Sequence, residues 1–194
     1  MRILTLCTIM LAALLLAGCY ESNGLLLDVS AARQPITTYQ DWNYGTGDHR
    51  YHARLNPRSD GWYDYEEAKI NDDGSEAAWK HHNVVLNYLT AANGYDVYVY
   101  GTWDDGEKAY YYGVVVVGTN GFWQSVTPNC DPVNADEAWY KPDLGAAQAA
   151  GATVKTIDGM EDVCLFTSKE QLFQAMNNVI AEPGFWNRVQ QATK

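Results

Sequence analysis

The chain has 194 residues, of which 47% are hydrophobic and 19% are charged, and its formal net charge is -11 at pH 7. The length favours one domain, or one domain plus a processed end, and the hydrophobic fraction excludes wholesale disorder. The acidic balance argues against a nucleic-acid-binding protein, because phosphate backbones are bound by dense Lys and Arg. It argues equally against electrostatic docking of the domain on an anionic membrane surface.

The amino-terminal residues have the pattern of an export signal. Arg2 supplies a minimal positive charge, and the apolar run at residues 3–17 is shorter than the about 20 residues of a membrane-spanning helix. The run ends in the sequence LAGC at residues 16–19, which resembles the lipobox of bacterial lipoproteins. The alternatives are an ordinary signal peptide, or an apolar helix that happens to end in Cys.

The lipobox resemblance implies an anchor and a location. It implies that a signal peptide of residues 1–18 is cleaved after Gly18, that Cys19 carries a thioether-linked diacylglyceryl group, and that an acyl chain such as palmitate is added to the new amino terminus. Several acyl chains hold a protein durably on a membrane, whereas one binds only marginally. In lipoproteins of enteric bacteria, Asp after the lipidated Cys retains the protein in the inner membrane. Here Tyr20 follows, so the resemblance implies an outer-membrane lipoprotein that faces the periplasm.

The remaining cysteines predict a disulfide. Cys7 leaves with the leader and Cys19 carries lipid, which leaves Cys130 and Cys164. An oxidising compartment favours pairing of two such thiols. Closing the loop between them should stabilise the fold by about 3–4 kcal/mol in the chain-entropy model. The alternative, a redox-active pair, lacks the Cys-x-x-Cys spacing that lowers a thiol pKa.

The mature chain is expected to begin with a tether. We expect residues 19–35 to form this lipidated tether and residues 36–194 to form a single globular domain. At the start of the domain, short β-favouring segments alternate with clusters of Gly, Asp and Asn that favour turns. These segments lie at residues 36–42, 51–55 and 62–65.

The next segment predicts an amphipathic helix that begins at Asp73. Asp73 and Glu76 form a capping-box pattern, and Asn93-Gly94 is typical of a helix end. Between them, apolar residues recur at spacings of three and four, as expected for one stripe of a helix. The stripe consists of Ala78, His82, Val85, Leu86 and Leu89.

Residues 95–126 predict an antiparallel β-meander. The segments 95–103 and 108–118 flank a turn around Asp105-Gly106, and a second turn leads into residues 122–126. Asp-Gly and Asn-Gly between β-branched and aromatic runs are strong hairpin signals.

The carboxy-terminal part predicts three helices around a strand pair. Asp143 starts a short helix, and residues 152–157 and 161–167 predict two strands. Ser168 begins a second capping-box pattern, and Pro183 suits the first turn of a last helix. The whole pattern predicts an α+β domain in which an antiparallel meander sheet packs against amphipathic helices and is stapled by one disulfide.

Histidines offer only weak metal candidates. His49 and His52 lie near several acids, but their spacing fits no known metal motif and no Cys remains to help. We therefore expect polar loop residues and no metal. His81 and His82 would point about 100° apart on a helix. His82 belongs to the apolar stripe and is expected to be semi-buried.

The sequence contains no catalytic or cofactor motif. It has no Gly-x-Ser-x-Gly elbow, no phosphate-binding Gly-rich loop and no dinucleotide fingerprint, so we expect no cofactor and no enzyme activity. A glycan hydrolase needs two carboxylates across a cleft. With 24 Asp and Glu in the chain, close pairs arise by chance, which makes a carboxylate pair a weak signal.

Aromatic residues make up 13% of the chain. Tyr98, Tyr100 and Tyr111 share one face of the predicted meander and form a candidate binding face. Tyr and Trp are favoured at protein interfaces and, as rigid amphipathic rings, as platforms for sugars. The alternative is core and cross-strand packing, which aromatic residues also favour.

These observations favour a non-catalytic, lipid-anchored envelope protein that binds a protein partner. An inhibitor or immunity-type lipoprotein that neutralises a basic toxin or lysozyme-like enzyme suits the acidic charge, because opposite potentials speed encounter. One alternative is an envelope enzyme that acts on peptidoglycan or another glycan through two carboxylates. Another is a purely structural envelope lipoprotein.

Overall fold

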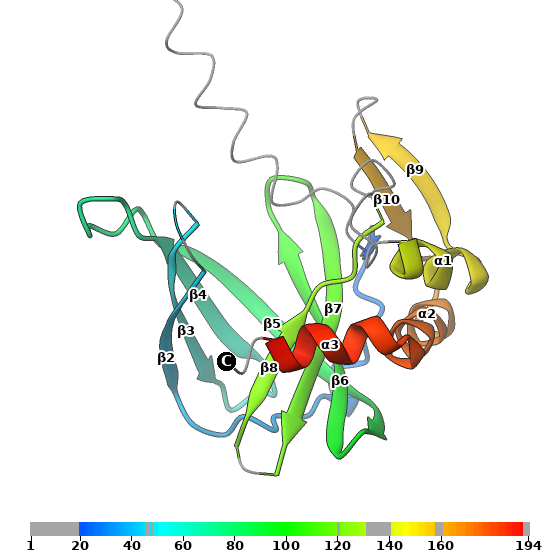
Figure 1. Ribbon diagram of the computed structural model, residues 1–194, viewed down its shortest axis with the longest axis horizontal. Coiled ribbons are helices and arrows are strands. Elements are labelled where there is room, and N and C mark those ends of the chain that lie inside the picture. Colours follow the sequence, from blue (N-terminus) through cyan, green and yellow to red (C-terminus); the bar gives the residue numbers. More distant parts are fainter. Residues whose placement is uncertain are drawn as a thin grey trace, which may run out of the picture. The chain divides into compact units, whose positions relative to one another are not determined.

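Strands dominate the computed structural model (Figure 1). Its described residues form ten strands and three α-helices, and the strands make one mixed sheet in which most neighbours are antiparallel. This content agrees with the predicted α+β class. The described residues are 20–45, 47, 49–119, 121–130, 141–157 and 161–191.

The chain divides into two compact units. The strand-rich unit comprises residues 23–110 and 115–124. The helix-containing unit comprises residues 111–114 together with the described residues before 23 and after 124. Strands β7 (Ala109–Gly118) and β8 (Trp123–Val126) pair with each other and contribute residues to both units. Each unit is described by itself below.

In the strand-rich unit, five strands follow one another along the chain, and each is antiparallel to the next. The segments predicted at residues 36–42, 51–55 and 62–65 correspond to the first three of these strands, each shifted or extended toward its carboxyl end. The strands are β2 (Gln40–Tyr44), β3 (Tyr51–Pro57), β4 (Tyr63–Lys69), β5 (Lys80–Ala92) and β6 (Tyr95–Asp104).

The helix predicted from Asp73 is wrong, because strand β5 occupies most of that segment. Asn93 and Gly94 have φ values of 52° and 81°, so they form the two-residue turn of a hairpin in which Ala92 pairs with Tyr95. Positive φ at both turn positions matches the right-handed twist of the flanking strands. The Asn-Gly pair therefore ends a strand in the structure, whereas the sequence predicts the end of a helix.

Two features of this segment conceal the strand periodicity. Three consecutive residues from Val85 to Asn87 are buried, so both faces of β5 are covered there and apolar residues do not simply alternate. A register shift between Tyr88 and Thr90 interrupts the pattern again. Asp73 accepts hydrogen bonds from the backbone and hydroxyl of Ser75, so it stabilises a tight turn and not a helix start.

A cluster of buried aromatic and aliphatic side chains forms the core of the strand-rich unit. The side chain of Tyr63 is 1% exposed, and its hydroxyl accepts the backbone N–H of Ile36 at 3.2 Å. Burial raises the pKa of Tyr63 to about 12, so the ring remains neutral in the core. The cluster consists of Ile36, Leu55, Tyr63, Leu86, Tyr98 and Val115.

The helix-containing unit has the three helices and two strands predicted for the carboxy-terminal part, but its first helix begins at Lys141, so Asp143 lies in the first turn instead of starting the helix. Ser168 accepts a hydrogen bond from the backbone N–H of Gln171 at 3.2 Å and caps α2, as its pattern predicts. The face of α2 that is buried includes Leu172, Met176 and Val179. The elements are α1 (Lys141–Ala149), β9 (Thr153–Ile157), β10 (Glu161–Leu165), α2 (Lys169–Ala181) and α3 (Pro183–Gln191).

The predicted disulfide is present in this unit. Cys130 and Cys164 are bonded, their Cα atoms are 5.8 Å apart, and neither residue is exposed. The bond joins the segment after β8 to β10, which is antiparallel to β9 (Figure 1). Within the part of the chain that the structure describes, no helix combines the length and hydropathy needed to cross a bilayer.

Residues 19–35, predicted to form a tether, belong to the fold wherever they are described. Strand β1 (Tyr20–Ser22) pairs with β10 in parallel, and all three of its residues are buried. The 3-10 helix η2 (Val29–Ala31) follows, and the buried side chain of Asn87 bonds both backbone groups of Asp28, at 2.8 and 2.9 Å. These contacts join residues that are distant in sequence. The composition of residues 19–35, from which the tether is predicted, does not reveal them.

Candidate functional site

One face of β2–β5 carries a continuous set of charged and amide side chains. The register places Arg54 opposite Asp41 on one side and Glu66 on the other, and Glu66 opposite His81. Because side chains alternate along a strand, these residues point away from the cluster that contains Leu55. We call this set the polar face; it consists of Asp41, Arg54, Asn56, Arg58, Asp64, Glu66, His81 and Asn83.

The polar face contains a groove of about 440 Å³. Tyr39 stands beside it with 53% of its surface exposed, and its hydroxyl donates to Asp41 Oδ2 at 2.9 Å. That hydrogen bond to a carboxylate raises the pKa of Tyr39. The groove is lined by Tyr39, Arg54, Asn56, Asp64, Tyr65, Glu66, His81, His82 and Asn83.

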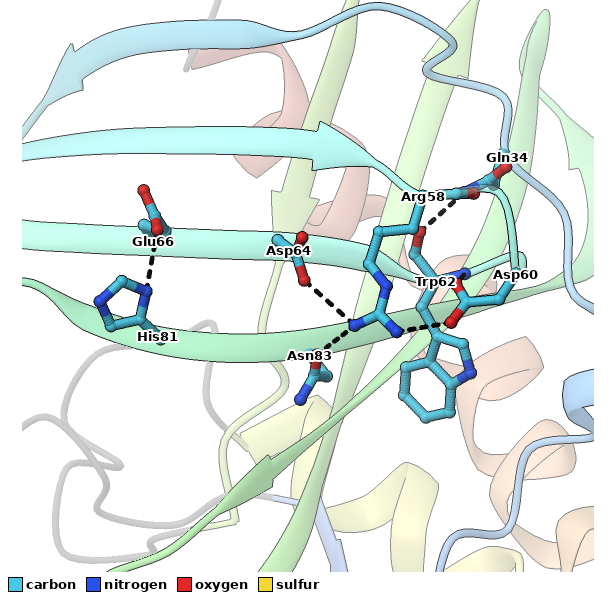
Figure 2. A network of polar contacts seen from close by, with 8 residues as sticks. All are labelled: Gln34, Arg58, Asp60, Trp62, Asp64, Glu66, His81 and Asn83. Atoms are coloured by element: carbon cyan, nitrogen blue, oxygen red, sulfur yellow. Dashed lines mark hydrogen bonds and ion pairs between the residues drawn. The ribbon is translucent and has the colours of Figure 1, made fainter.

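Arg58 organises one end of the polar face (Figure 2). Its guanidinium donates to Asp60 at 2.5 Å, to Asp64 at 3.1 Å and to Asn83 at 2.8 Å. Its two carboxylate partners raise the pKa of Arg58, and Arg58 in turn lowers the pKa of Asp60. The Gln34 amide donates to the carbonyls of Arg58 at 2.8 Å and Trp62 at 2.7 Å, which fixes the loop that carries this arginine.

His52 lies at the other end, between two carboxylates. Its Nε2 contacts Asp41 Oδ1 at 2.8 Å, and its Nδ1 contacts Glu76 Oε1 at 2.6 Å. Hydrogen bonds to Glu76 and then to Asp41 raise the pKa of His52. The guanidinium of Arg54 stacks 4.0 Å above the Trp79 ring and also contacts Asp41 at 3.4 Å.

The two histidines considered as metal candidates lie in different surroundings. His49 is exposed, whereas both ring nitrogens of His52 are already hydrogen-bonded to carboxylates. Among the residues that the structure describes, no three His, Cys, Asp or Glu side chains are grouped to hold a metal ion.

The consecutive His81 and His82 lie on opposite faces of a strand instead of a helix. His81 Nδ1 contacts Glu66 Oε1 at 2.8 Å across the polar face (Figure 2). The half-buried His82 ring packs 6.1 Å from the Tyr65 ring. The semi-buried position predicted for His82 is correct, although the predicted helix that led to it is not.

The predicted tyrosine face is not a surface. Tyr98 is 8% exposed and belongs to the core cluster, Tyr111 is 7% exposed, and Tyr100 is half-buried against that cluster. The alternative interpretation, core packing, therefore holds for these side chains. Among the described residues, the large apolar or aromatic side chains classed as exposed are Val29, Tyr39, Tyr44 and Tyr88.

The groove contains two carboxylates, but each contacts a basic group. Asp64 and Glu66 lie two residues apart on β4, and they contact Arg58 and His81. A carboxyl group that acts as a general acid lies instead in apolar surroundings that raise its pKa. Both carboxylates that line the groove are thus engaged in ion pairs.

No family model matches this chain, and no curated protein sequence or solved structure matches it significantly either. The predicted lipidation site, Cys19, lies outside the described residues.

Replacing His52 with Gln should remove a pH-dependent contribution to stability. The raised pKa means that the folded state holds the proton more tightly than the unfolded chain, whose His pKa is about 6.5. The contribution is therefore fully present below about pH 6.5 and disappears as the pH rises through the folded-state pKa. Urea denaturation between pH 5.5 and pH 8.5 should show the wild type losing more stability than H52Q as the pH rises.

The matched control is H49Q, which changes an exposed histidine of the same unit. Its unfolding midpoint should follow the wild type across the pH range. Parallel curves for H52Q and the wild type would show that the two carboxylates do not hold the imidazolium in solution.

Proposed function

We propose that this protein is a non-catalytic lipoprotein of the bacterial cell envelope, anchored by acyl groups on Cys19 after cleavage of residues 1–18. It faces the periplasm from the outer membrane and binds a protein partner through the polar face of its strand-rich unit. The lipobox pattern supports the anchor, and the disulfide between Cys130 and Cys164 suits an oxidising compartment.

The observation that carries the binding role is the set of side chains around the groove. Tyr, Trp and Arg are the residue types that most often dominate protein interfaces. Tyr39 is exposed at the groove, Arg54 stacks on Trp79, and the backbone N–H of Arg58 donates to the carbonyl of Trp62 at 2.8 Å (Figure 2). Such prearranged side chains lose little conformational entropy when a partner docks.

The charge of this region supports a basic partner. Five carboxylates, from Asp41, Asp60, Asp64, Glu66 and Glu76, belong to the ion pairs of the region, in which Arg54 and Arg58 supply the permanent positive charges. The whole chain carries a net charge of -11. Opposite potentials speed encounter, so a basic toxin or lysozyme-like enzyme is the class of partner that fits.

The test captures partners on the purified protein from solubilised envelopes and then titrates each captured protein against defined variants. Replacing Tyr39 with Ala should weaken binding of the true partner by about tenfold or more, as for an interface anchor. The matched control is Y88A, which truncates another exposed tyrosine of the same unit outside the groove. Raising the ionic strength from about 0.05 M to about 0.5 M should also weaken binding, because salt screens the complementary charges.

Several outcomes would contradict parts of the proposal. Absence of any saturable, salt-sensitive partner would remove the binding role, and envelope damage on deletion without any challenge would then favour the structural lipoprotein. Failure of radiolabelled palmitate to enter the wild-type protein, or unchanged maturation and fractionation of a C19S variant, would remove the anchor. Release of soluble fragments from peptidoglycan by the purified protein would instead favour the glycan-acting enzyme.

A further inference from the structure

The strand that begins one residue after the proposed lipid attachment site is fully built into the fold. Tyr20 is 0% exposed, its ring lies 4.9 Å from the ring of Phe166, and its hydroxyl donates to the carbonyl oxygen of Asp143 at 2.5 Å. Burial is the main reason that the pKa of Tyr20 is strongly raised, so the ring remains neutral. A side chain held in this way cannot belong to a loose linker.

The rest of β1 is tied down as firmly. Tyr20 pairs with Cys164 and Glu21 with Leu165, and the Glu21 carbonyl accepts the N–H of Phe166 at 2.9 Å. The Ser22 hydroxyl lies 2.7 Å from the Tyr112 hydroxyl. Glu21 and Ser22 are 6% and 2% exposed. The three residues that follow the predicted lipidation site, Tyr20–Ser22, are therefore fixed within the helix-containing unit.

We propose that the helix-containing unit rests directly on the lipid headgroups at the end where β1 begins, with no tether between the bilayer and the fold. This inference depends on the proposed acylation of Cys19. Consecutive Cα atoms are about 3.8 Å apart, so the acylated residue lies within about 4 Å of a buried strand. The headgroup layer on each side of a bilayer is about 5–8 Å thick, so acyl chains in the hydrocarbon layer draw the fold up to the headgroups.

The register identifies which surface meets the lipid. Strands β1 and β10 are parallel, and Tyr20 at the start of β1 pairs with Cys164. Strand β10 begins at Glu161, three residues earlier, so it extends about 10 Å beyond the start of β1 on the side of the anchor. Strand β9 accompanies it, with Lys155 opposite Val163 (Figure 1). The end of this strand pair at Ile157 and Glu161 therefore lies among the headgroups.

The chemistry of this contact differs from that of the polar face. Lys155 and Thr156 are exposed, and Glu161 and Asp162 belong to the adjoining strand, so the described residues at this end include one basic residue and no cluster of them. Anionic lipids are bound by clusters of Lys and Arg. The contact is thus imposed by the covalent anchor and should not depend on salt, whereas binding through the polar face should.

The test measures the depth of Lys155 in a bilayer. Full-length acylated protein carrying K155C, labelled with a fluorophore, is reconstituted into vesicles of phosphatidylethanolamine and phosphatidylglycerol that contain nitroxide-labelled headgroups. The lipid should quench at least about half of the fluorescence at both low and high salt. The matched variant carries a Gly/Ser linker of about 20 residues between Cys19 and Tyr20, whose end-to-end distance averages about 25 Å. That linker should abolish most of the quenching.

The outcomes separate this inference from the function on which it rests. If the protein incorporates palmitate and floats with the vesicles, but quenching is equally weak with and without the linker, the direct contact is wrong and the lipoprotein assignment stands. If the protein incorporates no palmitate and does not float, the assignment fails and the contact fails with it. Strong quenching that the linker removes supports both.

Discussion

Replacing Arg188 with Met should lower the free energy of unfolding by about 3–5 kcal/mol, the usual cost of removing one partner of a buried ion pair. Arg188 Nη1 and Nη2 contact the two carboxylate oxygens of Asp143 at 2.8 and 2.9 Å. The side chains of Asp143 and Arg188 are 0% and 15% exposed, so the variant leaves a buried carboxylate without its counter-charge. Urea denaturation followed by circular dichroism measures the change.

The position of the ion pair explains why its loss should destabilise the whole helix-containing unit. Asp143 lies at the start of α1 and Arg188 lies in α3, and the Asp143 carboxylate also accepts the backbone N–H of Asn129 at 3.1 Å. The Asp143 carbonyl accepts the hydroxyl of Tyr20, which connects the same residue to β1. One residue thus joins two helices, a loop and a strand of the helix-containing unit.

Two controls make this prediction specific. K108M removes an exposed partner of Asp105 and should leave the unfolding midpoint unchanged, because both side chains are largely in solvent. The double variant D143L/R188M removes both charges and should be more stable than R188M alone. If R188M unfolds within about 1 kcal/mol of the wild type, the ion pair does not hold this unit together.

Reducing the disulfide, or replacing both of its cysteines with Ala, should lower the free energy of unfolding by about 3–4 kcal/mol. The bond closes a loop of 34 residues and so restricts the unfolded chain. It also fixes Cys164, the partner of Tyr20, so its loss weakens the strand that follows the proposed anchor. Comparing urea denaturation of the oxidised and reduced wild type measures the entropic effect without a change of side chain.

Single variants serve as the control for this second prediction. C130A and C164A each leave one buried thiol, and both should be about as unstable as the reduced wild type. Equal unfolding midpoints for oxidised and reduced protein would mean that the cross-link does not stabilise the native state. A larger loss in C164A than in C130A would show how much the Cys164 side chain packs in addition to the bond.

The starts of α2 and α3 could be predicted because their signals are local. The hydroxyl of Ser168 reaches an N–H three residues away, and Pro183 requires only its own φ angle, so α2 and α3 begin where the sequence predicts. The segment before Asn93 is ambiguous between a helix and a strand, because its end signal is also local. An Asn-Gly pair satisfies both a helix end and a hairpin turn, and the choice between them depends on pairing with residues 95–102.

The candidate site was mostly not predictable from spacing. The sequence pairs His52 with its near neighbour His49, whereas its partners in the structure are Asp41 and Glu76, and these three residues come from different segments of the chain. The residue type does not distinguish Tyr98 from Tyr39. Tyr98 is buried and Tyr39 is exposed because of where each lies relative to the sheet. Cross-strand neighbours on the polar face are set by the pairing register of the strands, which depends on the buried opposite face and on the turns, and not on the spacing of the polar residues along the chain.

The amino-acid sequence by itself determined the α+β class, the carboxy-terminal helices and the pairing of Cys130 with Cys164. Turn residues and helix caps act over a few residues of the chain. The pairing of two thiols follows from the chemistry of cysteine. Tertiary structure decided that β5 is a strand, that β1 is buried beside β10, and that Asp143 meets Arg188. Each of these depends on desolvation by residues far along the chain, and the free energy of burial exists only once those residues have packed together.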